Sequence, residues 1–299
     1  MSAIQHFTSF KLIPFTAVGA VLGWRLAQNP SVRVSVVCRS NYEAIQKNGI
    51  SLKTAIWGAG HFRPARVCRN ASELRHVPFD YVVCANKATS SSAHGSITSV
   101  VREKTVLVSA QNGVGVEEPL QRSFPRQTIL SGIVYVACTQ PTPGVFYQNT
   151  SINARSLALG LFAKPACPED HRARHSRLLD FASLESTFGV SEDIVKEKWI
   201  KQLWNGAFNT TAAISGMHTH QLLSSPKHLE LVTNVMRETH QVAKASNVSL
   251  EDGIIETLLA TTMSRAPVVP SMLQDALAGK PMEIESLCGK WSSRSLCSI

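Results

Sequence analysis

The chain has 299 residues, of which 44% are hydrophobic and 17% charged, which is typical of a folded globular protein long enough for two domains and excludes a mainly disordered one. The formal net charge of +9 does not indicate nucleic-acid binding, because the lysines and arginines are scattered, without a run of five or interleaved aromatic residues. A basic balance equally suits an anionic cofactor and an anionic substrate.

The N-terminal region is expected to form a buried strand and helix over residues 12–27. The first acidic residue is Glu43, a pattern also found in signal and transit peptides. No apolar run reaches membrane-spanning length, because Arg25 and the polar residues after it interrupt the longest one. We therefore predict a folded segment and no membrane partner.

Short β-rich runs alternate with amphipathic or polar segments over the first half of the chain. They predict buried strands at residues 31–38, 80–85, 105–109 and 128–135. This alternation indicates an α/β domain with a parallel sheet wrapped by helices, which we place at residues 1–188.

The pattern becomes helical from about Val190. Long helices are predicted at residues 194–215, 226–245 and 251–264. An all-helical domain over residues 189–299 is therefore expected, and its polar last residues suggest a truncated end.

Cysteines and histidines point to no metal site. The seven cysteines are odd in number and form no CxxC pair, and they stand at positions 38, 68, 84, 138, 167, 288 and 297. They are expected to be buried thiols in a reducing compartment, the cytoplasm, with the mitochondrion as the alternative. His218 and His220 lack a third ligand at a suitable spacing, so a surface or capping role is favoured.

The first predicted helix opens with a glycine, as in a dinucleotide-binding unit. If Gly19 is the third glycine of a G-x-G-x-x-G turn, Pro14 and Thr16 replace the first two. Proline lacks an N–H donor, so the motif alone is a weak signal. Twenty residues after Gly19 stands Arg39, and an arginine there favours a 2′-phosphate, which indicates NADPH.

Further polar residues follow two of the predicted strands. Asn86 and Lys87 come after the strand that ends at residue 85, and Gln111, Asn112 and Gly113 follow the next strand. Ligands of parallel sheets bind at this edge, although a surface lysine and a plain Asn-Gly turn are the alternatives.

Three polar side chains recur at every fourth position of a predicted helix. Lys201, Asn205 and Asn209 therefore share one helix face, and an ammonium flanked by two amides suits a polarised carbonyl. Further along, Ser271 and Glu283 offer a hydroxyl and a carboxylate twelve residues apart.

In their order and spacing these motifs resemble the ketopantoate reductase family, the 2-dehydropantoate 2-reductases. The Leu-Trp-Asn-Gly-Ala-Phe-Asn segment resembles the fungal branch. The resemblance implies a Rossmann-like domain, a doubly wound parallel sheet, followed by an all-helical domain. It also implies reduction of 2-dehydropantoate, a small 2-keto acid, to (R)-pantoate by NADPH on the route to pantothenate and coenzyme A, and it is compatible with a homodimer.

The resemblance also implies a role for each matching residue. Lys201 is the general acid, with Glu283 accepting the substrate hydroxyl and Asn112 beside the nicotinamide as the other catalytic positions. The implied substrate-binding residues are Asn205, Asn209 and Ser271. The implied cofactor-binding residues are Ala17, Val18, Gly19, Arg39, Ser40, Lys87 and Asn112.

The replaced glycines at positions 14 and 16 leave two hypotheses open, and a third concerns the substrate. The protein is an active NADPH-dependent reductase, a non-catalytic relative that binds the cofactor weakly, or a reductase of another 2-keto acid. Titration with NADPH separates the first two, and rates with ketopantoate and ketoisovalerate separate the first from the third.

Overall fold

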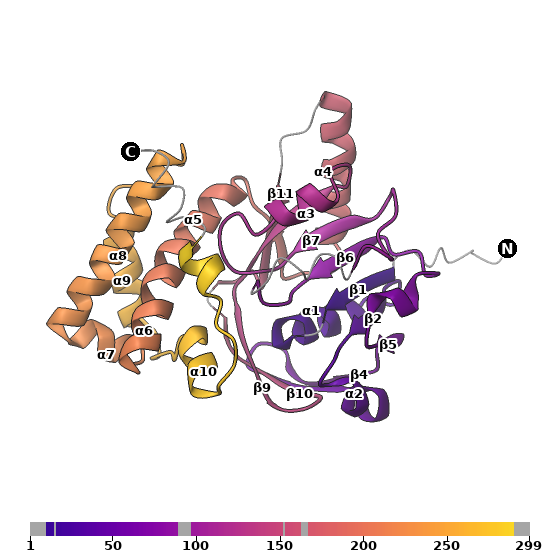
Figure 1. The fold of residues 1–299 in the computed structure, drawn as a ribbon, viewed down its shortest axis with the longest axis horizontal. Helices are drawn as coiled ribbons and strands as arrows, with labels where there is room; N and C mark the ends of the chain where they lie inside the picture. The colour runs from indigo at the N-terminus through magenta and orange to yellow at the C-terminus, as the bar shows by residue number, and fades with distance from the viewer. Residues whose placement is uncertain (1–9, 15, 89–96, 152, 163–166, 290–299) are drawn as a thin grey trace. The chain divides into compact units, whose positions relative to one another are not determined.

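The computed structural model describes residues 10–14, 16–88, 97–151, 153–162 and 167–289 (Figure 1). The chain divides into two compact units. Unit 1 comprises residues 1–111 and 117–194, and unit 2 comprises residues 112–116 and 195–299. Asn112 therefore belongs to the same unit as the C-terminal helices.

The main sheet of unit 1 has eight strands in the order β12-β11-β8-β7-β6-β1-β2-β5. The six strands from β5 to β8 run parallel in the arrangement of a dinucleotide-binding sheet, whereas β11 is antiparallel to β8. The strands are β1 (Phe10–Pro14), β2 (Arg33–Val37), β5 (Arg66–Cys68), β6 (Tyr81–Cys84), β7 (Val106–Ser109), β8 (Ile129–Val134), β11 (Leu157–Leu161) and β12 (Phe188–Val190). The parallel sheet predicted from the sequence is confirmed.

The strand side chains alternate between two hydrophobic clusters, one on each face of the sheet. Val83 and Val108 join a cluster with α1 (Ala17–Ala27) and α4 (Pro168–Ala182). Val82 and Leu107 join a second cluster that includes residues of η1 (Ala71–Leu74) and α3 (Glu118–Ser123). Both faces are covered, which explains why these strands are apolar throughout.

A second sheet in unit 1 was not predicted. Its order is β4-β3-β10-β9, and it consists of β3 (Ile50–Thr54), β4 (Gly58–Phe62), β9 (Val136–Thr142) and β10 (Val145–Ser151). Helix α2 (Tyr42–Asn48) leads into β3. The alternating burial of β3 shows that one face of the strand is exposed, which weakened the hydrophobic signal.

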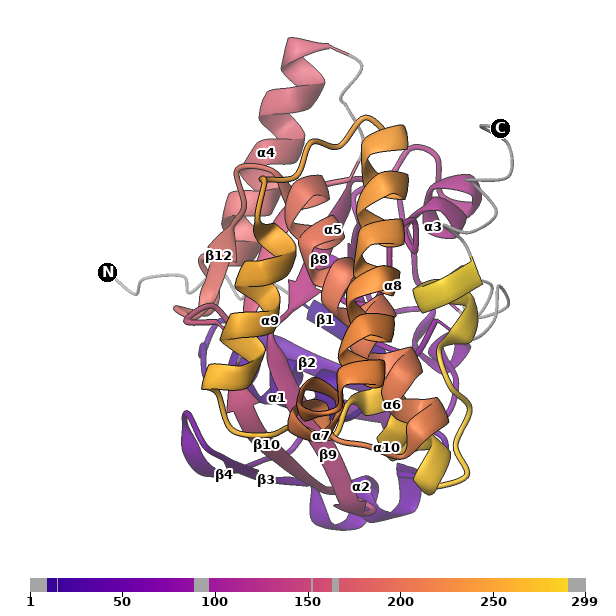
Figure 2. The same ribbon diagram turned by 90° about the vertical axis from the view of Figure 1, so that its left-hand side faces the viewer.

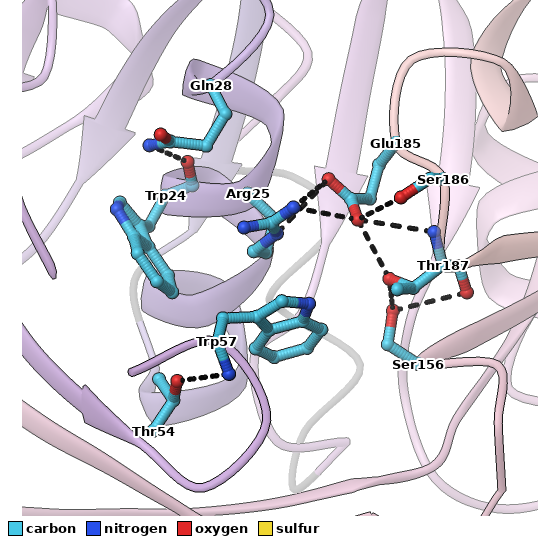
Figure 3. A network of polar contacts seen from close by, with 9 residues as sticks. All are labelled: Trp24, Arg25, Gln28, Thr54, Trp57, Ser156, Glu185, Ser186 and Thr187. Atoms are coloured by element: carbon cyan, nitrogen blue, oxygen red, sulfur yellow. Dashed lines mark hydrogen bonds and ion pairs between the residues drawn. The ribbon is translucent and has the colours of Figure 1, made fainter. Parts of the chain in front are cut away.

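An ion pair fixes α1 within unit 1 (Figure 3). Arg25 donates from Nε and Nη2 to the carboxylate of Glu185, each at 3.1 Å, and its guanidinium lies 5.0 Å from the ring centroid of Trp57. Glu185 also accepts hydrogen bonds from the backbone N–H and the hydroxyl of Thr187. Its buried carboxylate is thus fully engaged, as a buried charge requires.

Unit 2 is helical apart from its loops. Its longest helix is α8, which is labelled together with α7 and α9 in Figure 2. Helix α8 contacts α7, α9 and the segment η4. The elements are α5 (Ile194–Trp204), η4 (Asn205–Asn209), α6 (Thr210–Ser215), α7 (Thr219–Ser224), α8 (Pro226–Ala245), α9 (Ile254–Ser264), α10 (Ser271–Leu277) and η5 (Glu285–Gly289). The helix predicted at residues 194–215 is present, but its middle, η4, is a π-helical turn. Within the described ranges, no helix is both long and apolar enough to cross a membrane.

Six cysteines lie in the described part of the chain, and all are free thiols. Cys38, Cys68 and Cys84 are buried, and desolvation raises the pKa of each, to about 11 for Cys38 and about 12 for the other two. In contrast to the prediction of buried thiols, Cys138 and Cys288 are half-buried and Cys167 is exposed. Cys297 lies outside the described residues.

Candidate active site

A chain of hydrogen bonds in unit 2 joins the three predicted catalytic residues. Lys201, in the last turn of α5, donates from Nζ to Oδ1 of Asn112 at 2.9 Å. Asn112 in turn donates from Nδ2 to Oε2 of Glu283 at 3.3 Å. The amide of Asn112 thus binds the ammonium group of Lys201 through its oxygen and the buried carboxylate of Glu283 through its nitrogen.

The environment of Lys201 lowers its pKa from 10.5 to about 8. Burial is the main cause, because it disfavours the charged form, and the nearby charge of Lys198 acts in the same direction. The carboxylate of Glu283 opposes both effects and raises the pKa. The ammonium group is therefore a stronger proton donor than an ordinary lysine.

The π-helical turn explains how the two asparagines stay on the face of Lys201. In a regular α-helix, every fourth residue advances by about 40° around the axis, so Asn209 would have drifted by about 80° from Lys201. The wider turn of η4 reduces this drift, and Asn209 donates from Nδ2 to Oδ1 of Asn205 at 3.4 Å. Single π-turns of this kind recur at functional sites.

Asn209 also joins this face to α10. Its Oδ1 accepts from the hydroxyl of Ser271 at 3.1 Å and from the backbone N–H of Met272 at 3.0 Å. The structure therefore brings together the three predicted substrate-binding residues, Asn205, Asn209 and Ser271. Asn205 and Asn209 are buried, whereas Ser271 is exposed.

Gln202 holds the segment that carries Glu283. Its Nε2 donates to the carbonyl oxygen of Leu287 at 2.8 Å, and the N–H of Leu287 donates to the carbonyl of Glu283 at 3.1 Å. Gln202 directly follows Lys201 on α5, so one helix positions both charged groups. Gln202 was not among the predicted site residues, because in the sequence it looks like an ordinary polar residue.

The loop of Asn112 depends on the glycine that follows it. Gly113 has φ of +104°, and a Cβ there would lie 2.3 Å from the carbonyl oxygen of Ser286. We expect Gly113→Ala to lower the free energy of unfolding by about 1–3 kcal/mol and to lower kcat by displacing Asn112. Denaturant titration and steady-state rates measure both effects.

Gly216→Ala is the matched control for Gly113→Ala. Gly216 has a φ of +72° but open space around its Cβ position. This variant carries backbone strain without the clash, so its kcat should equal that of the wild type. Wild-type stability and activity in Gly113→Ala would contradict the role assigned to the loop.

Three of the predicted cofactor residues follow strands of the main sheet at its carboxyl edge. Arg39 and Ser40 follow β2 and are exposed, and Lys87 follows β6 and is half-buried. Gln111, after β7, donates from Nε2 to the carbonyl oxygen of Asn86 at 2.9 Å. This edge presents cations at the end of β2 and near the end of β6.

The side chain of Thr16 forms a helix cap before α1 that was not predicted. Its hydroxyl caps the helix by accepting from the N–H of Gly19 at 3.1 Å, and it donates to the carbonyl oxygen of Ala85 at 2.8 Å. A threonine directly before an apolar helix is a standard capping signal. Ala17, Val18 and Gly19 form the first turn of α1.

Two family models match most of the chain. The model described as ketopantoate reductase PanE/ApbA matches residues 15–162, and the model described as ketopantoate reductase PanE/ApbA C terminal matches residues 193–294. A 2-dehydropantoate 2-reductase from Mesorhizobium japonicum is 28% identical over 296 residues, covering 91% of this chain and 86% of the relative.

Solved structures share the fold over nearly the whole chain. The 2-dehydropantoate 2-reductase from Methylococcus capsulatus superposes with a TM-score of 0.80 at 29% identity, covering 97% of this chain and 91% of that chain. D-mandelate dehydrogenase with NADH and anilino(oxo)acetate also gives a TM-score of 0.80, over 96% of this chain and 92% of that chain; at 19% identity it shows the fold alone. From the two family models together, we conclude that this chain belongs to the ketopantoate reductase family of oxidoreductases.

Proposed function

We propose that the protein reduces 2-dehydropantoate to (R)-pantoate with NADPH, on the route to pantothenate and coenzyme A, with Lys201 as general acid. The observation that carries the proposal is the hydrogen-bonded chain from Lys201 through Asn112 to Glu283. It provides a proton donor of lowered pKa and an acceptor for a substrate hydroxyl within one unit.

The residues of unit 1 fit NADPH at its adenosine end. Arg39 is exposed at the end of β2, where a guanidinium can bind a 2′-phosphate with two parallel hydrogen bonds. The first turn of α1 is suited to the pyrophosphate, although Thr16 already accepts from one of its N–H groups. When bound, NADPH supplies the hydride that the carbonyl carbon accepts.

In the proposed mechanism, Lys201 donates a hydrogen bond to the ketone oxygen. As negative charge develops there, the ammonium proton passes to the oxygen, which leaves a hydroxyl group and a neutral amine. The amine regains its proton from solvent. Asn112 keeps Nζ in one orientation through its 2.9 Å hydrogen bond, so little reorganisation is needed during the reaction.

The other polar residues are proposed to hold the rest of the substrate. The carboxylate of Glu283 accepts a hydrogen bond from the substrate hydroxyl. The hydroxyl of Ser271, which donates to Oδ1 of Asn209 in the structure, turns from this acceptor to donate to the substrate carboxylate. The amides of Asn205 and Asn209 orient the substrate and shape the helix face beside the lysine.

NADPH oxidation by the purified protein tests this proposal directly. We expect saturable turnover with 2-dehydropantoate and a much lower kcat/KM with 2-ketoisovalerate, which lacks the hydroxyl that Glu283 is proposed to bind. Equal kcat/KM values for the two acids would favour a broader 2-keto acid reductase. No turnover with either acid would contradict the proposal.

The cap at Thr16 specifically supports a second candidate, a relative in which cofactor binding is impaired. Its hydroxyl occupies the N–H of Gly19, which a phosphate would otherwise use. No saturable binding of NADPH at millimolar concentration would favour this candidate over the active reductase.

Thr16→Gly tests how far the cap limits cofactor binding. We expect the Kd for NADPH to fall about three- to tenfold, because a helix N–H becomes available, while replacing a capping threonine by glycine costs only a few tenths of a kcal/mol. Fluorescence titration measures the Kd, and Thr16→Ser, which keeps the hydroxyl, serves as the control. Weaker binding by Thr16→Gly would show that the threonine supports the site.

A further inference from the structure

The carboxyl ends of β2 and β5 bring a second arginine next to the turn of Arg39. The two strands are parallel neighbours, with Val37 opposite Cys68, and the N–H of Cys38 donates to the carbonyl oxygen of Cys68 at 2.9 Å. Arg39 is the residue after Cys38, and Arg69 is the residue after Cys68. Both arginines therefore leave the same edge of the sheet side by side.

The position of the Arg69 guanidinium is set by two contacts with α2. It lies over the ring of Tyr42, 4.2 Å from the centroid, and it forms an ion pair with Glu43. The N–H of Tyr42 donates to the carbonyl oxygen of Arg39 at 3.2 Å, so the aromatic ring is part of the turn that Arg39 opens. Arg69 remains 52% exposed in its side chain, which leaves room for a ligand.

A buried side chain holds this turn in one conformation. The Oδ1 of Asn41 accepts from Nε2 of Gln140 and, at 3.2 Å, from the backbone N–H of Gly144. Asn41 is only 6% exposed and is the residue just before α2. Arg39 and Tyr42 thus lie on a fixed turn, and Arg69 reaches this turn from the end of β5 by stacking on Tyr42.

We propose that Arg69 is a second cation for the 2′-phosphate of NADPH and, together with Arg39, determines the preference for NADPH over NADH. The inference rests on the proposed function, because it assigns a residue to the same cofactor. A phosphate monoester carries about −1.5 to −2 charges at pH 7, so two guanidinium groups match it better than one. A guanidinium has five N–H donors, so one arm can contact Glu43 while others bind phosphate oxygens.

The ion pair with Glu43 distinguishes binding from a purely structural role. An exposed pair contributes little to stability, and the Glu43 side chain is 81% exposed. If Arg69 merely tethers α2, loss of either partner should have the same effect. If Arg69 binds the 2′-phosphate, Glu43 competes with the ligand, and its removal should strengthen binding.

The experiment compares 2′,5′-ADP and 5′-AMP as probes of the adenosine end, with NADPH and NADH titrated in parallel. We expect Arg69→Gln to raise the Kd for 2′,5′-ADP and NADPH about tenfold, because one charge-assisted contact is lost. The Kd for 5′-AMP and NADH should change by less than twofold. Glu43→Gln should lower the Kd for 2′,5′-ADP. Arg66→Gln is the matched control, because Arg66 is an exposed arginine at the opposite end of β5.

Specific results would overturn the inference. One is that Arg69→Gln leaves the Kd for 2′,5′-ADP unchanged. Another is that Arg69→Gln weakens binding of 5′-AMP as much as binding of 2′,5′-ADP. The third is that Glu43→Gln weakens binding of 2′,5′-ADP as much as Arg69→Gln does. The role of Arg69 would be wrong, and the proposed function would still stand, if Arg39→Gln abolished the discrimination between 2′,5′-ADP and 5′-AMP while Arg69→Gln left it intact. No binding of NADPH by the wild-type protein would overturn the proposed function and this inference together.

Discussion

Replacing Lys201 with alanine is expected to lower kcat for ketone reduction by about 10²-fold or more, the usual effect of losing a general acid. The variant removes the proton donor and leaves Oδ1 of Asn112 without its 2.9 Å partner. Steady-state NADPH oxidation measures the effect. Lys196→Ala is the matched control, because Lys196 lies on the same helix and pairs with the largely exposed Glu251. An unchanged rate in Lys201→Ala would remove Lys201 from its proposed role.

The pKa of Lys201 also predicts how the reduction depends on pH. A general acid must be protonated, and the pKa is lowered to about 8, so kcat/KM should be constant below about pH 7 and fall as the pH rises through about 8. Lys201→Arg should be slower but should lose this decline, because a guanidinium stays protonated throughout that range. A wild-type profile that is flat up to pH 9.5 would contradict the assignment.

Replacing Glu283 with glutamine is expected to lower kcat/KM by about 10- to 100-fold, since a buried charge-assisted acceptor for the substrate is lost. The variant should also move the alkaline decline to lower pH. The carboxylate raises the pKa of Lys201, and without it burial and Lys198 act unopposed. The pH profile of kcat/KM therefore reports the interaction between Glu283 and Lys201, in addition to the change in rate.

A matched control separates the Glu283 effect from a general change in charge. Glu285 lies two residues further on and is exposed, so Glu285→Gln removes the same charge from the same segment. We expect both the rate and the pH profile of Glu285→Gln to match the wild type. If Glu283→Gln also left the decline where it is, the proposed coupling between Glu283 and Lys201 would be wrong.

Strands β5, β11 and β12 of the main sheet were not predicted, but β2, β6, β7 and β8 could be, because they are largely buried and apolar. The second sheet could not. Strand β4 consists largely of exposed residues, and β3 pairs with β10 across more than ninety residues of sequence. Such a pairing is decided by tertiary contacts, which the local hydrophobic pattern does not contain.

Only part of the candidate site could be predicted, because the local sequence pattern does not contain its long-range contacts. The spacing of Lys201, Asn205 and Asn209 was enough to place them on one face, but the π-turn that keeps them there left no signal that we recognised. The family resemblance named Asn112, Lys201 and Glu283 as catalytic residues but did not predict that Asn112 contacts the other two. Lys201 is 89 positions and Glu283 is 171 positions from Asn112 in the sequence. The cap at Thr16 was readable from the sequence, because threonine before an apolar helix favours capping.

The division of the chain has a consequence for dissecting this protein. Residues 112–116 belong to unit 2 although the chain on both sides of them belongs to unit 1. A fragment that starts at Val195 would therefore contain Lys201 and Glu283 but no amide between them. In such a fragment Lys201, the proposed general acid, would lack its hydrogen bond to Asn112, so the site cannot be isolated by cutting the chain at a single point.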